Sequence, residues 1–188
     1  MKITLRTVLC WIATALVIAA FIVSFGAGIK GNPLNILTEY KGLAFGKQTT
    51  VTIIGGSVIE NETVKPVDSL ISKIAVILIL VGGVFAGLVG TFKTKFNKKG
   101  LLIFAALIIV VGAVMMLFTK EGWIDSQIKE MFKDSSASQS TIDKAKESMT
   151  KTYEDFINND GTIFTSVLGF AAAALTGLSA TLKEKKGK

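Results

Sequence analysis

The sequence predicts an all-α membrane protein, a bundle of four transmembrane helices that carries a small extracellular domain. Two observations predict it. Half of the 188 residues are hydrophobic while 19% are charged, and the charged residues cluster between long neutral runs. Four runs contain no charged residue: 7–29, 74–92, 100–119 and 161–182. Each is close to the roughly 20 apolar residues that a helix needs to cross a hydrocarbon core, and none alternates as a barrel strand does.

The basic residues indicate how these spans are oriented. Lysine and arginine gather before the first span, between the second and third, and after the fourth, whereas segment 120–160 has six lysines against nine acidic residues. Short basic loops usually face the cytoplasm. The net charge of +7 is therefore explained by topology rather than by nucleic-acid binding. We expect a multi-pass protein of the plasma membrane with both termini in the cytoplasm and both long loops outside.

These observations divide the chain into alternating spans and loops. The four predicted transmembrane helices occupy residues 1–29, 69–93, 100–121 and 161–182. The predicted loops and tail are a β-rich extracellular loop at 30–68, a basic cytoplasmic link at 94–99, a helical extracellular loop at 122–160, and a basic cytoplasmic tail at 183–188.

The two long loops have different patterns. In the first, segments 37–45, 47–54 and 56–64 are rich in β-branched residues and separated by turn signals, which predicts a small antiparallel sheet. In the second, residues 123–134 and 141–157 have helical periodicity, which predicts a helical hairpin. Its second helix carries an apolar face that we expect to cover other outer segments or to bind a partner. The site residues assigned to this outer-loop interface are Ile142, Met149, Tyr153 and Phe156.

Glycine is concentrated at the end of the second span. Gly82 and Gly87 have the spacing of a phosphate-binding loop, but Leu88 stands where such a loop needs lysine. Small residues in a membrane helix instead allow close approach of a neighbouring backbone. We therefore assign Gly83, Gly87 and Gly90 to a helix-packing face, either within the chain or with another subunit.

The fourth span has a second stripe of small residues, which recur every four positions. Its members are Thr165, Gly169, Ala173 and Gly177. Contact with another span of the same chain and contact with a second membrane protein both fit this pattern, since either brings two helix backbones together.

Residue types that usually support catalysis are scarce. The chain has no histidine, and Cys10 is its only cysteine, so an intrachain disulfide and the ordinary zinc ligand sets are excluded. No span carries an ionisable residue away from its ends, which argues against an ion-coupled transporter. We expect no enzymatic activity, no cofactor and no metal, and the sequence identifies no small-molecule substrate.

One short segment of the first loop resembles a known family. Residues 40–45 read Tyr-Lys-Gly-Leu-Ala-Phe and are similar to the Gly-Leu-Trp segment of claudin-type proteins, with the tryptophan replaced and without the family's paired loop cysteines. The resemblance is one of topology. The predicted layout, with a strand-bearing first loop and third and fourth spans that extend outward, resembles the claudin-type tetraspan arrangement, and the family's function is not carried over.

The function we expect is that of a non-catalytic integral membrane interaction protein, either a tetraspan-type accessory subunit or a self-associating scaffold. Its outer loops and small-residue helix faces would bind another membrane protein or a second copy of the chain within the lipid bilayer. The alternative is a channel or transporter component, because a pore lined by hydroxyls and backbone does not need charged residues.

Overall fold

The structure is a computed structural model in which the chain divides into two compact units. One unit contains residues 1–22, 74–114 and 164–188, and the other contains 23–73 and 115–163. The residues that the structure describes are 4–26, 28–31, 36–41, 47–54, 57–66, 70–92, 96–119, 121–122, 125, 128–129, 132–133, 136–154 and 160–182.

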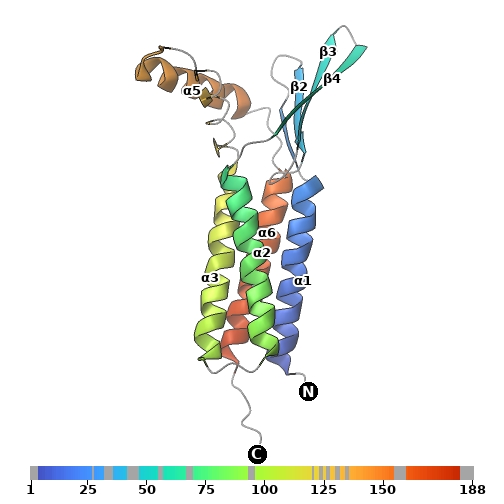
Figure 1. Ribbon diagram of the computed structural model, residues 1–188, viewed down its shortest axis with the longest axis vertical. Coiled ribbons are helices and arrows are strands. Elements are labelled where there is room, and N and C mark those ends of the chain that lie inside the picture. Colours follow the sequence, from blue (N-terminus) through green and yellow to red (C-terminus); the bar gives the residue numbers. More distant parts are fainter. Residues whose placement is uncertain are drawn as a thin grey trace, which may run out of the picture. The chain divides into compact units, whose positions relative to one another are not determined.

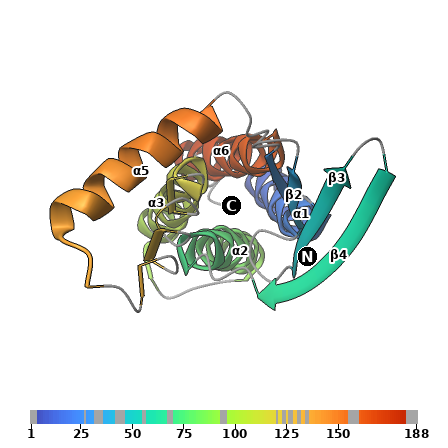
Figure 2. The same cartoon turned by 90° about the horizontal axis from the view of Figure 1, so that it is seen from above.

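Four long helices make up the membrane-length part of the protein. They are α1 (Leu5–Gly26), α2 (Leu70–Thr91), α3 (Lys98–Leu117) and α6 (Asp160–Thr181). All four are long and apolar enough to cross a membrane, so the prediction of a multi-pass bundle of four apolar helices is confirmed at this level. Figure 1 shows them running side by side, and Figure 2 shows them end-on as a four-membered bundle.

Small side chains fill the inside of the bundle, whereas large ones cover its outside. Alanines such as Ala13, Ala86 and Ala105 are fully buried, and larger side chains such as Ile79 and Ile109 fill the space between them. Most of the exposed residues on the same helices are Ile, Leu, Val and Phe. This distribution is typical of a membrane bundle, in which apolar side chains face lipid and small residues let the helix backbones approach.

Four strands lie between α1 and α2 in the chain: β1 (Gly28–Gly31), β2 (Ile36–Lys41), β3 (Lys47–Ile54) and β4 (Ser57–Pro66). They pair in sequence order as an antiparallel sheet, with Tyr40 opposite Gln48 and Val51 opposite Glu60. The sequence analysis expects three strands in this region, and that they form an extracellular domain stays a prediction. The register of β3 and β4 shifts between Gln48 and Thr50, as at a β-bulge, which bends a strand and increases its twist.

One further helix, α5 (Gln139–Glu154), lies in the segment between α3 and α6. Ser138 precedes it, and its hydroxyl lies 3.0 Å from the Thr141 hydroxyl, while its carbonyl accepts the Thr141 and Ile142 amides. A serine at this position stabilises the first turn of a helix. Most of the other predicted outer helix, residues 123–134, lies outside the described residues.

Candidate functional site

The predicted glycine face of α2 lies against α1. A Cβ atom added to Gly83 would stand 2.5 Å from Val17, one added to Gly87 would stand 2.5 Å from the Thr14 hydroxyl, and one added to Gly90 would stand 2.5 Å from Cys10 Cβ. Real Cβ atoms do not approach other atoms this closely. The two backbones therefore pack at a separation that only glycine allows.

Two hydroxyls on α1 bond to backbone carbonyls along this contact. The Thr14 hydroxyl donates to the Gly83 carbonyl at 2.9 Å, and the Thr7 hydroxyl donates to the Gly90 carbonyl at 3.1 Å. The Thr14 oxygen also lies 2.9 Å from the carbonyl of Cys10 on its own helix. Such bonds between membrane helices contribute about 0.6 kcal/mol each on average.

A second close contact joins α2 to α3, and the sequence analysis did not find it. A Cβ added to Gly82 would lie 2.6 Å from Ile109, and one added to Gly112 would lie 2.7 Å from the Ala75 carbonyl oxygen. Gly82 directly precedes Gly83, and successive residues of a helix point about 100° apart. Gly82 therefore packs against α3, and Gly83 packs against α1. Two features of the sequence could have indicated this contact: the Gly82-Gly83 pair, and Gly112 inside the third apolar run.

The small-residue stripe of α6 behaves differently along its length. Thr165, Gly169 and Ala173 are buried, and a Cβ added to Gly169 would lie 3.0 Å from Ala113 Cβ on α3. Near it, the Ser166 hydroxyl donates to the Ala113 carbonyl at 3.0 Å. A Cβ added to Gly177, by contrast, would meet nothing within 4 Å. The structure thus brings three of the four predicted residues into the bundle and leaves open space beside the fourth.

Arg6 makes the main polar contact at the end of the bundle where α1 begins and α6 ends. Its side chain is almost fully buried; Nε donates to the Ser179 carbonyl at 3.0 Å, and Nη2 donates to the Leu182 carbonyl. The last carbonyls of a helix have no partners within the helix and carry partial negative charge. A guanidinium at this position therefore supplies both the missing hydrogen-bond donors and a compensating positive charge. The sequence analysis used Arg6 only as evidence for orientation.

An apolar cluster joins all four helices behind this contact. It contains Cys10 of α1, Ala86 and Val89 of α2, Leu102 and Ala105 of α3, and Ala180 of α6, with Phe85 and Leu101 packed against it. The Cys10 thiol donates to the Ser179 hydroxyl at 3.3 Å, and Ser179 donates onward to the Thr176 carbonyl at 2.6 Å. The buried polar atoms of this region are therefore hydrogen-bonded, as burial requires.

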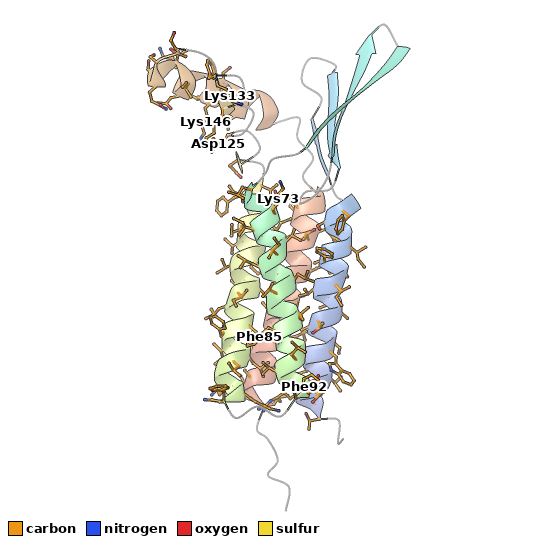
Figure 3. All side chains as sticks on the ribbon, viewed as in Figure 1. Lys73, Phe85, Phe92, Asp125, Lys133 and Lys146 are labelled. Atoms are coloured by element: carbon orange, nitrogen blue, oxygen red, sulfur yellow. The ribbon has the colours of Figure 1, made fainter. Side chains whose placement is uncertain are left out.

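The predicted outer-loop interface is described only in part. Ile142 of α5 is half-buried, whereas the side chains of Met149 and Tyr153 and all of Phe156 lie outside the described residues. Nearby, Ile128 is buried, and Lys146 Nζ lies 2.6 Å from a carboxylate oxygen of Asp125 (Figure 3). The hydrogen bond and the charge of Asp125 raise the pKa of Lys146 above its ordinary value. This ion pair is exposed and contributes little to stability.

Among the described residues, no three His, Cys, Asp or Glu side chains come together to hold a metal ion. The contacts of these residues are those of helix packing: glycine faces, hydroxyl-to-carbonyl bonds and a guanidinium on a helix end. No protein-family model matches the sequence, and no curated protein matches it either.

Proposed function

We propose that this protein is a non-catalytic membrane interaction protein, a tetraspan-type accessory subunit or a self-associating scaffold of the plasma membrane. In this proposal the bundle is an anchor, and the segments 30–68 and 122–160 bind the partner outside the cell. The partner is another membrane protein or a second copy of the chain. The basic residues that flank the helices support cytoplasmic termini.

The observation that carries the proposal is that the glycines of α2 and α3 pack against other helices of the same chain. Gly83, Gly87 and Gly90 contact α1, and Gly82 and Gly112 join α2 to α3. Because these close contacts are already occupied, the α2 face is not available to a second membrane protein. This shifts the expected partner surface from the glycine face to the outer segments, one of which contains helix α5.

Site-specific photo-crosslinking in native membranes tests this proposal. We would place the photoreactive group at Gln139, Ser140 or Lys144, which are exposed on α5, and at Ile103 or Leu107, which are exposed on α3. The α5 positions are expected to form adducts of protein mass. The α3 positions are the matched controls and are expected to react with lipid.

Mass measurement after purification in mild detergent completes the test. A stable assembly that contains the crosslinked partner supports an accessory subunit, and an adduct with a second copy supports a scaffold. A strictly monomeric protein without protein adducts at any α5 position would contradict both.

One observation favours the alternative, a channel or transporter component. Nine hydroxyl side chains are buried in the described part of the chain: Thr7, Ser24, Ser72, Thr119, Thr162, Thr165, Ser166, Thr176 and Ser179. Hydroxyls can line a pore, although the Thr176 hydroxyl bonds to the Ala172 carbonyl of its own helix at 2.8 Å. Ion flux in proteoliposomes that changes in Thr176→Val, but not in the exposed control Thr181→Val, would support the channel.

A further inference from the structure

One end of the bundle concentrates positive charge. By sequence, the segments that begin or end the four helices there, residues 1–6, 92–99 and 182–188, hold ten lysines and arginines and a single acid, Glu184. The Arg6 contact with α6 and the Thr7 contact with α2 bring those helix ends together. This excess of nine positive charges is larger than the net charge of the whole protein, +7.

Exposed aromatic side chains accompany this charge. Trp11, Phe92 and Phe96 are 45%, 60% and 77% exposed, and Figure 3 shows Phe92 at the end of α2. The Trp11 indole N–H donates to the Thr91 hydroxyl at 2.8 Å, which fixes the ring across the α1–α2 contact. An indole ring, which is partly apolar and partly polar, favours the headgroup level of a bilayer, and exposed phenylalanine rings suit the boundary between headgroups and acyl chains.

The start of α3 adds a local electrostatic conflict. The helix begins with Lys98 and Lys99, and its first turn has no acidic residue. Asn97 Oδ1 accepts the Lys99 amide at 3.1 Å, which stabilises this turn. A helix N-terminus carries partial positive charge, so two lysines there are repelled by it. Lys99 is exposed at this turn and can approach an anion in the surrounding interface.

We propose that this end of the bundle binds anionic phospholipid headgroups. The lipid phosphate lies beside Lys98 and Lys99, and Trp11, Phe92 and Phe96 contact the glycerol and upper acyl region. Lysines near an anionic bilayer surface contribute attraction that falls off within a Debye length. Phospholipid fits better than nucleic acid or an acidic protein, because exposed apolar aromatics at the end of a membrane-length helix suit the interface rather than water.

Lipid retention measured by native mass spectrometry tests this inference on the full chain. The protein would be released from micelles that contain equal amounts of phosphatidylglycerol and phosphatidylcholine, with inorganic phosphate as a separate arm. We expect preferential retention of phosphatidylglycerol, reduced by added salt and not displaced by millimolar phosphate. In Lys98→Gln/Lys99→Gln the preference should fall roughly 25-fold, since each lysine near an anionic surface contributes about fivefold in affinity.

The matched control is Lys133→Gln/Lys144→Gln, which removes the same charge from exposed positions in the segment 120–160. It should retain phosphatidylglycerol as the wild type does. A phosphatidylglycerol with a photoreactive group near its headgroup should label the peptides that contain Trp11 and Phe96. Equal retention of the two lipids, an equal loss in both double variants, or labelling confined to other peptides would overturn the inference. The proposed partner function does not depend on this result, because the crosslinking positions lie on α5.

Discussion

The glycine face of α2 and the small-residue stripe of α6 look alike in sequence but differ in the structure. Gly83, Gly87 and Gly90 all lie against α1, with added Cβ atoms 2.5 Å from their neighbours. In α6 the contact loosens to 3.0 Å at Gly169 and is lost at Gly177. The stripe of α6 has more small residues than the face of α2, so the spacing of these residues rather than their number explains the difference.

Helical geometry supplies the reason. Four residues turn an α-helix about 40° beyond one full turn, so three steps of four, from Thr165 to Gly177, rotate the stripe by about 120°. On α2 the steps are four and then three, and Gly90 returns to within about 20° of Gly83. The buried residues of α6 follow the face that the stripe leaves, namely Thr176, Ser179 and Ala180. A small-residue stripe thus predicts close packing only while it stays on one face.

The largest expected effect is at Gly83. Gly83→Ala places a methyl group against Cβ and both methyl groups of Val17, a side chain that is stiff because it is β-branched. We expect the free energy of unfolding to fall by about 1–3 kcal/mol, as measured by denaturant unfolding in a fixed detergent. An unchanged value would mean that α1 and α2 are farther apart than the structure has them.

The contrasting change is at Gly177. Gly177→Ala meets open space, and alanine is more favourable than glycine in a helix interior by about 1 kcal/mol. We expect stability to rise by up to that amount in the same detergent assay, with unchanged assembly. A loss of stability, or of oligomers, would show that another subunit covers this part of α6.

The smallest expected effect concerns the hydroxyl that bridges α1 and α2. Thr14→Val keeps the shape of the side chain and removes the bond to the Gly83 carbonyl. We expect a loss of about 0.6 kcal/mol, the average for such bonds in a membrane. Thr14→Ser is the control, since it retains the donor. Equal stability of the valine variant and the wild type would assign this contact to glycine packing alone.

The sequence predicts the membrane spans and the outer segments unequally well, because the two kinds of segment carry local signals of different strength. Apolar runs of membrane length are strong local signals, and all four predicted ones are helices. The amphipathic pattern at 141–157 corresponds to α5 at Gln139–Glu154. Strand β1 has the sequence Gly-Ile-Lys-Gly, which has no strand pattern of its own. Its assignment as a strand comes from pairing with β2.

The sequence by itself determined the four membrane-length helices, the glycine face of α2 and the charge at the helix ends, since these depend on composition and period along one segment. Tertiary structure alone decided which helix each glycine meets. Gly82 faces α3 while Gly83 faces α1, and Arg6 binds the last carbonyls of α6 rather than solvent. A helix's period defines its faces, but the neighbour on each face depends on how the segments pack in space.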